Sequence, residues 1–288
     1  MTQHGQDLRE ALRAAAETLA AAGVPDPAVD AELLAGHLLQ QGRGELAAAA
    51  LRGESFTPAQ QADFAALVAR RAAREPLQHL TGTAPFRHLE LAVGPGVFVP
   101  RPETEIVAQF AIDALLAAPD PAPIGVDLGT GSGAIAAAMA TEVAHAEIYA
   151  AEKSAAAWEW AQRNTVGIPN LTLVHADLAD AFDELAGRAH VVISNPPYVP
   201  DAAVPRDVEV RLYDPPEALY GGEDGLDIVR ILSQRAAFLL RPGGLLVIEH
   251  GELQGEAIRD ILRADGWRMP QTHPDLTSRD RATTATRA

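Results

Sequence analysis

The stretch Val191-Val192-Ile193-Ser194-Asn195-Pro196-Pro197-Tyr198 joins an apolar run to a pair of prolines. Residues 191–193 are β-branched and apolar, which predicts a short buried strand. Proline has a fixed φ and no N–H, so Pro196 and Pro197 cannot extend a central strand. The sequence therefore predicts a stiff corner at the end of this strand, with Asn195 on one side and Tyr198 on the other.

The corner offers two hydrogen-bond acceptors, the Asn195 amide oxygen and the Pro196 carbonyl oxygen. Two acceptors on a rigid turn can hold both hydrogens of a planar NH2 group, and the Tyr198 ring can lie against that group. We assign Asn195, Pro196, Pro197 and Tyr198 to a substrate site. The alternative is a Pro-Pro loop in which Asn195 and Tyr198 have no function.

Composition limits the protein class. A chain of 288 residues suggests two domains, and a hydrophobic content of 48% supports a globular core. The absence of cysteine excludes disulfides and cysteine metal sites. No leader pattern or membrane-length apolar run is visible, so we expect a cytoplasmic protein without membrane association. A net charge of −16 disfavours direct nucleic-acid binding. Separately, we expect the protein to be a monomer.

The first part of the chain predicts a small all-helical domain over residues 1–82. Helical spacing and breaker residues place helices at 6–22, 29–39, 46–51 and 58–74, the last with Thr57 as N-cap and Pro58 as first residue. This domain carries no catalytic constellation and is interpreted as a binding module. Its basic cluster, Arg70, Arg71 and Arg74, is expected to be a solvated helix end. A docking surface for an acidic or RNA-bound partner is the alternative.

Residues 83–104 predict a linker. Apolar residues alternate around Gly94-Pro95-Gly96, which suggests a β-hairpin joining two domains. Arg101 and Glu103 lie among prolines, where the backbone is stiff. They form either a surface ion pair or part of a substrate-site wall.

Residues 105–288 predict a second domain of the α/β class. The expected strands are 124–128, 146–151, 171–175, 191–194 and 245–248, and the expected helices are 105–116, 134–143, 155–164, 226–240 and 256–264. A polar connection spans 199–224, and closing strands follow Trp267. Repeated βα units imply a mostly parallel sheet covered on both faces by helices. Ligands of such sheets bind at the carboxyl ends of the strands.

A glycine loop follows the first of these strands. It begins after Asp127 and comprises Gly129, Thr130, Gly131, Ser132 and Gly133. Such a loop alone also fits a dinucleotide fold. Asp127 is placed to meet an ammonium group, Glu152 to accept from ribose hydroxyls, and Asp177 to accept from an adenine amino group. This set suits S-adenosylmethionine, and it includes no residue suited to bind the nicotinamide of a dinucleotide.

The glycine loop and the Asn195–Tyr198 corner together resemble class I, Rossmann-like methyltransferases acting on an amide or exocyclic amine. Further motifs resemble the HemK/PrmC family of protein-(glutamine-N5) methyltransferases of class I release factors. These motifs are residues 76–78, 95–105, 221–226 and 275–281. The resemblance implies roles for Phe98 and Leu178 in the cofactor site, together with Asn195. Glu152 and Leu178 depart from the family, which often has Asp and an aromatic residue there, and His250 stands where Ile is common.

The family resemblance implies methylation of the glutamine in the Gly-Gly-Gln loop of a release factor, with S-adenosylmethionine as cofactor and no metal. Asn195, Pro196 and Tyr198 are the expected catalytic residues, while Arg101 and Glu103 are added to the substrate site. The alternatives are a glutamine methyltransferase of a ribosomal protein, a nucleic-acid adenine-N6 methyltransferase and a non-catalytic cofactor-binding protein. His79, His88 and His250 lack metal-ligand spacing and are interpreted as structural.

Overall fold

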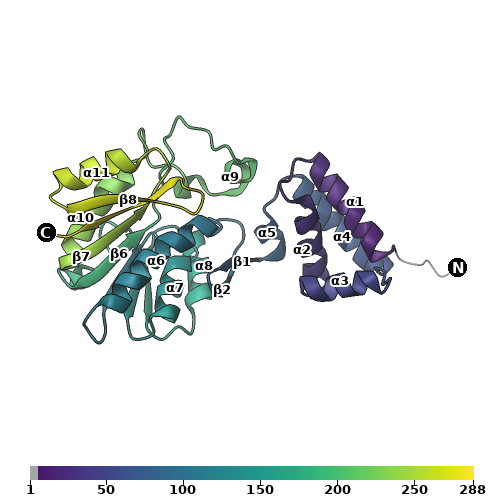
Figure 1. Cartoon of the computed structure of the whole chain (residues 1–288), viewed down its shortest axis with the longest axis horizontal. Coiled ribbons are helices and arrows are strands. Elements are labelled where there is room, and N and C mark those ends of the chain that lie inside the picture. The colour runs from purple at the N-terminus through teal and green to yellow at the C-terminus, as the bar shows by residue number, and fades with distance from the viewer. Residues whose placement is uncertain (1–5) are drawn as a thin grey trace. The chain divides into compact units, whose positions relative to one another are not determined.

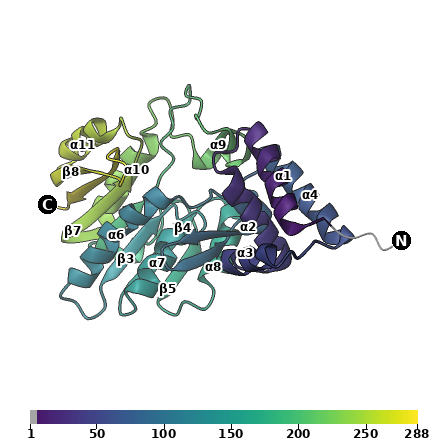
Figure 2. The same cartoon turned by 45° about the vertical axis from the view of Figure 1, so that its right-hand side comes forward.

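The computed structural model describes residues 6–288, which divide into two compact units (Figures 1 and 2). The helical unit contains the chain up to residue 83 together with residues 206–213. The sheet unit contains residues 84–205 and 214–288. The first five residues of the expected helical domain lie outside the described residues.

The helical unit packs amphipathic helices around one core. Its first helices are α1 (Leu8–Ala21), α2 (Pro27–Leu39), α3 (Arg43–Leu51), α4 (Pro58–Ala72) and α5 (Leu77–Thr81). Leu19, Leu34 and Phe56 are among its fully buried side chains. Thr57 is the N-cap of α4 and Pro58 its first residue, as the sequence predicts, and Thr57 also forms a capping box with Gln60. The five-residue helix α5 was not predicted, because it is too short to show a helical period.

Helix α9 (Val208–Tyr213) comes from much later in the chain and completes the helical unit. The sequence placed this segment in an irregular connection. Its Glu209 carboxylate accepts from Arg71 Nη1 at 2.8 Å and from Arg74 Nε at 3.0 Å. The Tyr213 hydroxyl donates to the Ala73 carbonyl at 3.4 Å. A surface helix of six residues is stable here because its polar groups are paired with α4 and the residues after it.

Arg71 lies inside this unit rather than at its surface. Only 4% of the residue is exposed, and its Nε donates to Asp30 Oδ2 at 2.7 Å. The prediction of a solvated basic cluster is therefore wrong for Arg71. Arg70 does stay at the surface, where its side chain is 54% exposed and pairs with Glu75. A helical period cannot distinguish these two arginines, because the partners of Arg71 are distant in sequence.

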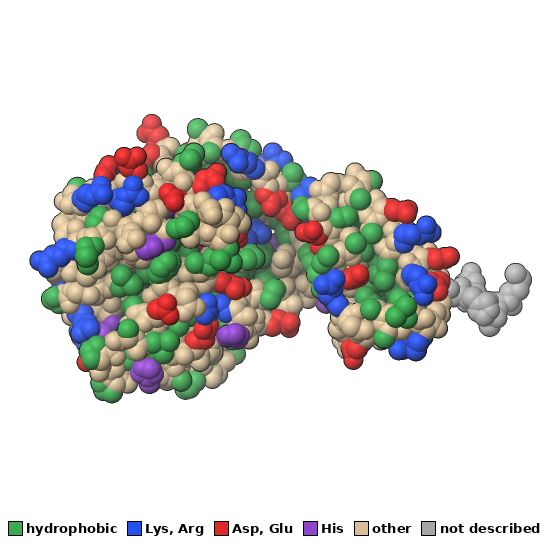
Figure 3. All heavy atoms as spheres, in the orientation of Figure 1, with side chains coloured by type: hydrophobic (Ala, Val, Ile, Leu, Met, Phe, Trp, Pro, Cys, Tyr) green, Lys and Arg blue, Asp and Glu red, His purple; other side chains and the backbone are tan. Residues whose placement is uncertain are grey.

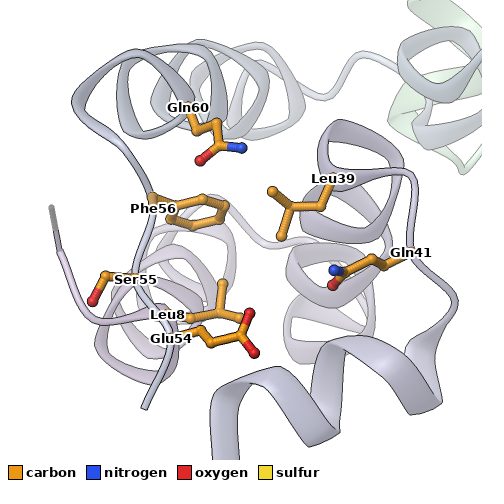
Figure 4. A pocket seen from close by; sticks show the side chains of 7 residues that line it. All are labelled: Leu8, Leu39, Gln41, Glu54, Ser55, Phe56 and Gln60. Atoms are coloured by element: carbon orange, nitrogen blue, oxygen red, sulfur yellow. The ribbon is translucent and has the colours of Figure 1, made fainter. Parts of the chain in front are cut away.

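The helical unit also contains a pocket of about 240 Å³, shown in Figure 4. Its lining combines apolar and amide side chains with one carboxylate: Leu8, Leu39, Gln41, Glu54, Ser55, Phe56 and Gln60. The pocket holds no set of titratable side chains that could perform chemistry.

A two-stranded hairpin, β1 (Thr83–Phe86) and β2 (Leu89–Ala92), follows α5, and all of it after Thr83 belongs to the sheet unit. Its turn is at Arg87, with φ of 53°, and not at Gly94-Pro95-Gly96 as the sequence suggested. Gly94 has another role. A Cβ there would stand 2.6 Å from the Trp160 ring, whose Nε1 donates to the Pro95 carbonyl at 3.2 Å. The glycine thus allows an aromatic ring to pack on the backbone.

The main sheet has seven strands in the order β5-β4-β3-β6-β7-β9-β8. The parallel strands are β3 (Ile124–Leu128), β4 (Glu147–Glu152), β5 (Leu171–His175), β6 (Ala189–Ser194) and β7 (Leu240–Glu249). The closing strands β8 (Arg268–Pro274) and β9 (Asp280–Thr286) are antiparallel, as β9 pairs with both β7 and β8. The expected α/β class is confirmed. Strand β7 begins at Leu240, ahead of the expected start at residue 245, and its pairing with β6 shifts register near Pro242-Gly243-Gly244.

Helices cover both faces of this sheet (Figure 1). Apolar residues of α6 (Pro102–Ala117) and α7 (Ala134–Glu142) form one core with the sheet. Those of α10 (Asp227–Leu239) and α11 (Gly255–Ala264) form a second core on the other face. Helix α8 (Ala155–Thr165) packs beside α7. Among residues 6–288, no helix has the length and apolar content needed to cross a bilayer.

Helix α6 begins at Pro102, three residues before the expected start. Glu103 therefore lies in the first turn of a helix and not in an extended proline-rich segment. Proline is favoured at this position because its missing N–H would have no helical partner anyway. An acidic residue in the first turn also interacts favourably with the helix dipole.

The buried ion pairs of Arg71 generate a stability prediction. Arg71→Met should lower the free energy of unfolding of the helical unit by about 3–5 kcal/mol, because Asp30 would stay buried without its cation. Arg70→Met is the matched control and should change it by no more than ~1 kcal/mol, since that pair is exposed. Hydrogen–deuterium exchange of α9 should accelerate in the first variant only. Equal protection of α9 in both variants would contradict a structural role for Arg71.

Candidate active site

The polar candidates gather at one edge of the sheet. In parallel pairing, Asp127 lies opposite Ala150 of β4 and Ile193 of β6, and Ser194 lies opposite Ile248 of β7. Strands β3, β4, β6 and β7 therefore end together. Strand order reverses between β3 and β6, and such switch points are where open α/β sheets bind ligands.

Asp127 lies beneath the glycine loop and is fully buried. Its Oδ2 accepts from Thr130 Oγ1 at 2.5 Å and from the Ala136 amide at 3.1 Å. Its Oδ1 is buried without a hydrogen-bond partner. Burial raises the pKa of Asp127 to about 7, although the Thr130 and Ala136 hydrogen bonds oppose that rise. One oxygen therefore orders the loop, and the other remains available to a donor.

The loop between β3 and α7 exposes backbone to a ligand. Gly131 has a φ of 58°, and a Cβ built there would meet no atom within 4 Å. Gly133, with φ of 82°, is the N-cap of α7, and a Cβ built there would stand only 3.1 Å from Thr165 Cγ2. Glycine is the residue that takes these conformations without strain. Gly129, Thr130 and Ser132 complete this loop at the open edge of the sheet.

Glu152 ends β4 and is 9% exposed. Its Oε2 accepts from the Gly131 amide at 2.8 Å, and its Oε1 accepts from the Ser154 amide at 2.7 Å. Burial raises the pKa of Glu152, and these backbone hydrogen bonds act in the opposite direction. Because each carboxylate oxygen has further lone-pair capacity, Glu152 can order the loop and still accept from a ligand.

Asp177 follows β5, with its side chain 39% exposed. A hydrogen bond from the Ala179 amide and an ion pair with Lys153 at 2.8 Å lower its pKa. Leu178 is half-buried against the core under α10. Glu152 ends β4 and pairs with His175, the last residue of the adjacent strand β5. Asp177 follows two residues later, so it lies at the same edge of the sheet as Glu152.

The Asn195 corner leaves β6 as the sequence predicts. Asn195 Nδ2 lies 3.5 Å from Thr104 Oγ1, while no donor within residues 6–288 reaches Asn195 Oδ1 or the Pro196 carbonyl. The Tyr198 carbonyl accepts from Gln254 at 2.9 Å, and burial raises the pKa of the Tyr198 phenol to about 12. The corner is thus fixed on one side and retains two available acceptors.

The motif at residues 221–226 supports this corner through close backbone packing. A Cβ on Gly221 would stand 2.5 Å from the Pro197 carbonyl oxygen, and one on Gly225 would overlap the Tyr198 carbonyl oxygen. The Gly221 amide donates to the Val199 carbonyl at 2.9 Å. The glycines therefore let this segment lie directly on the corner.

Arg101 and Glu103 do not pair with each other. Arg101 donates to Asp214 Oδ2 at 2.9 Å, and its guanidinium lies 5.1 Å from the centre of the half-buried Phe98 ring. Glu103 instead lies 3.7 Å from Arg279. The alternative of a surface ion pair between Arg101 and Glu103 is therefore wrong.

The motif at residues 275–281 forms the turn between β8 and β9. Asp275 Oδ1 accepts from the Thr277 amide at 2.8 Å and the Arg279 amide at 3.1 Å. Arg281 lies 3.5 Å from Asp275 Oδ2 and donates to the His250 carbonyl at 3.4 Å. The turn thus carries its arginines to the carboxyl end of β7 and the start of α6.

Sequence reasoning missed one residue of this edge, Glu249. It ends β7, is 3% exposed, and hydrogen-bonds to the side chains of Thr104 and Asn195. Burial raises its pKa to about 7. The available signal was an acidic residue directly after an apolar strand, which is the same pattern that identified Glu152.

The histidines near these motifs form no metal site. Within residues 6–288, no group of three or more His, Cys, Asp or Glu residues is arranged to hold a metal ion. His250 is fully buried and hydrogen-bonds through Nε2 to Thr283 Oγ1 at 2.8 Å.

Known proteins match both units. Residues 10–82 match the family model "PrmC N-terminal domain", and residues 89–219 match "Methyltransferase small domain". A release factor glutamine methyltransferase from Streptomyces coelicolor is 48% identical over 95% of this chain and 96% of its own length. A release factor glutamine methyltransferase from Bifidobacterium longum is 42% identical over 95% of this chain and 97% of its own length.

A solved structure supports the fold alone. A 16S rRNA methyltransferase from T. thermophilus has a TM-score of 0.52, covers 72% of this chain and 50% of its own, and shares 21% identity. The two sequence relatives span almost the whole chain, and each is covered over almost its full length. The chain therefore belongs to the release factor glutamine methyltransferase family.

Proposed function

We propose that this protein transfers a methyl group from S-adenosylmethionine to the side-chain amide nitrogen (N5) of the glutamine in the Gly-Gly-Gln motif of class I peptide chain release factors. The observation that carries the proposal is the pair of available acceptors on the corner after β6, Asn195 Oδ1 and the Pro196 carbonyl. The full-length relatives are named for this activity.

The cofactor fits the residues at the β3 and β4 ends. A buried Asp127 Oδ1 without a partner is suited to the ammonium group, and Gly131 leaves open space above the loop. We assign Glu152 to the ribose, and Asp177 with Leu178 to the adenine. Phe98, Gly129, Thr130, Ser132, Gly133 and Asn195 complete the proposed contacts. When bound, S-adenosylmethionine supplies an electrophilic methyl group.

The protein's own residues align the substrate amide. An amide nitrogen is a poor nucleophile because its lone pair is delocalised into the carbonyl. Asn195 Oδ1 and the Pro196 carbonyl each accept one N–H, which orients the nitrogen and stabilises positive charge as the nitrogen–methyl bond forms and the sulfur–methyl bond breaks. S-adenosylhomocysteine would be the leaving group, and the methylated nitrogen would then lose one proton to solvent. Pro197 holds the corner, and the Tyr198 ring packs on the amide plane. Preorganised acceptors of this kind need no rearrangement during the reaction.

Arg101 and Glu103 are proposed to line the substrate side of the corner. Each is anchored, through Asp214 and Arg279 respectively, in the sheet unit. We assign no catalytic residue to the helical unit, and we propose that it binds another part of the folded release factor. A cytoplasmic, monomeric enzyme fits such a substrate.

Two other substrates are weighed against this proposal. A nucleic-acid adenine would need cationic contacts to phosphate, yet the chain has a net charge of −16. On the face drawn in Figure 3, blue and red side chains are intermingled on each unit and form no continuous basic surface. Glutamine of a ribosomal protein remains the nearer alternative, because the same acceptor pair suits it.

Labelled methyl transfer tests the substrate directly. Purified class I release factor, ribosomal proteins and adenine-containing DNA are incubated in parallel with the enzyme and labelled cofactor. The label should enter release factor, and peptide mass spectrometry should place it on the Gly-Gly-Gln glutamine. Labelling of a ribosomal protein or DNA, with none on release factor, would refute the proposed substrate.

Glu152 generates a prediction for the cofactor. Glu152→Ala should weaken S-adenosylmethionine binding by ~1.5–3 kcal/mol, the range for hydrogen bonds that involve a charged group. Isothermal calorimetry measures the change. Glu147→Ala is the control, because this exposed residue begins the same strand at the opposite edge of the sheet. Unchanged affinity in Glu152→Ala would remove Glu152 from the cofactor site.

Asn195 generates the prediction for catalysis. Asn195→Ala removes one acceptor of the substrate NH2, and turnover should fall on the order of 10²–10³-fold, by analogy with loss of one preorganised oxyanion-hole donor. Single-turnover methylation of release factor measures the rate, and calorimetry should find cofactor affinity much less affected. Near-normal turnover would mean that the corner is only a structural turn.

A further inference from the structure

Glu249 and Asn195 lie side by side at the edge of the sheet. Ser194 of β6 pairs in parallel with Ile248 of β7, so the next residue of each strand emerges at the same level. The Glu249 carboxylate hydrogen-bonds to the Asn195 side chain and to the Thr104 side chain of α6. Neither strand alone determines this contact, because it requires both strands to end together.

The chemistry of the two groups fixes the direction of their hydrogen bond. An ionised carboxylate only accepts, so Asn195 must present its Nδ2 to Glu249. Nδ2 also lies 3.5 Å from Thr104 Oγ1, and the Thr104 hydroxyl can pass its own hydrogen to Glu249. The nitrogen side of the Asn195 amide is thus occupied by protein, and Oδ1 is its available atom.

Burial of the Glu249 carboxylate at this position is unfavourable for the stability of the fold. Glu249 is 3% exposed, and its Oε2 is buried without a hydrogen-bond partner. Burying a carboxylate that is only partly hydrogen-bonded opposes folding. The charged side chains that act on it are Arg281 from β9 and Glu103 from α6, and Tyr198 also faces it. One attractive and one repulsive charge leave much of this cost uncompensated, which indicates a role beyond stability.

We propose that Glu249 is a positioning residue for methyl transfer, which fixes the Asn195 amide with Oδ1 turned toward the substrate nitrogen. This inference rests on the proposed function of the Asn195 corner. A negative charge on the nitrogen side of the amide also increases electron density on Oδ1. That makes Oδ1 a stronger acceptor as positive charge develops on the substrate nitrogen.

Glu249→Gln tests the orientation with little change in size. Glutamine can donate to Asn195 Oδ1 and so lets the amide turn, which a carboxylate does not. We expect kcat on release factor to fall roughly 10- to 100-fold, the equivalent of one hydrogen bond to a charged group. Thr104→Val, which removes the bridging hydroxyl, should give a smaller fall. The KM for S-adenosylmethionine should change much less than kcat in both variants, because they act mainly through the Asn195 Oδ1 that faces the substrate, while the other cofactor contacts are unaltered.

The matched control is Thr283→Val in strand β9. Thr283 lies opposite Ile248 of β7, is fully buried, and hydrogen-bonds to His250. Its substitution also removes a buried polar contact near the end of β7, but without touching Asn195. We expect its kcat to stay within about twofold of the native value. A comparable fall in kcat for Thr283→Val and Glu249→Gln would overturn the proposal, because general disturbance of β7 would then explain both.

A double-mutant cycle separates this inference from the proposed function. In the Asn195→Ala background, Glu249→Gln should change kcat less than about twofold, because its effect passes through the missing amide. Independent, multiplying losses would overturn the positioning role and leave the proposed function intact. Undiminished turnover in Glu249→Gln would do the same. Full turnover in Asn195→Ala would instead remove the role of the corner, and this inference with it.

The pH profile gives a readout that structural damage alone would not reproduce. The pKa of Glu249 is raised to about 7 by burial. Below that pH its protonated form can donate a hydrogen bond, so native kcat should fall as pH decreases through about 7. The glutamine of Glu249→Gln cannot ionise, so the variant should lack this fall in kcat and should have a low kcat at both pH 6 and pH 8. A native-like fall in kcat below pH 7 in the variant would contradict the positioning role of Glu249.

Discussion

Parallel pairing of β6 between β3 and β7 is the constraint on which the site depends. It brings the ends of these strands to one edge, so that Asp127, Asn195 and Glu249 lie near each other although they are distant in sequence. The two prolines then stop β6 at the required level, because neither can donate a ladder hydrogen bond. The glycine loop, the corner and the end of β7 therefore depend on one register. A shift of one residue would turn alternate side chains to the other face.

Three buried carboxylates at this edge show that function is favoured there over stability. Asp127, Glu152 and Glu249 are each less than 10% exposed, and burial raises the pKa of all three. Asp127 and Glu249 each retain one buried oxygen without a partner. A core designed for stability would replace such groups with apolar side chains. Their presence fits a site that receives a cationic cofactor and develops positive charge on its substrate.

Sequence reasoning predicted the parts of the molecule that have local signals. Three local patterns predict the structure of the segment in which they occur. They are the β-branched run before Pro196, the glycines after Asp127 and the periodic apolar residues of the helices. The features that it missed depend on distant partners. Arg71 is buried because Asp30 and Glu209 surround it, and α9 joins the helical unit through the same Glu209.

Two further errors have the same origin. Gly94 looked like a turn residue, but its small size serves the Trp160 ring. Glu249 carries the same signal as Glu152, but its importance follows from the hydrogen bond to Asn195, which only the packed sheet shows. Placement of a candidate residue at a strand end was therefore predictable, while its partner across the sheet was not.

The most direct measurement is a crystal structure of the enzyme with S-adenosylhomocysteine and a release factor. We expect the nitrogen of the Gly-Gly-Gln glutamine to lie within hydrogen-bond distance of both Asn195 Oδ1 and the Pro196 carbonyl. We also expect Asn195 Nδ2 to face Glu249. A glutamine nitrogen that contacts neither acceptor, or an Asn195 amide turned the other way, would contradict it.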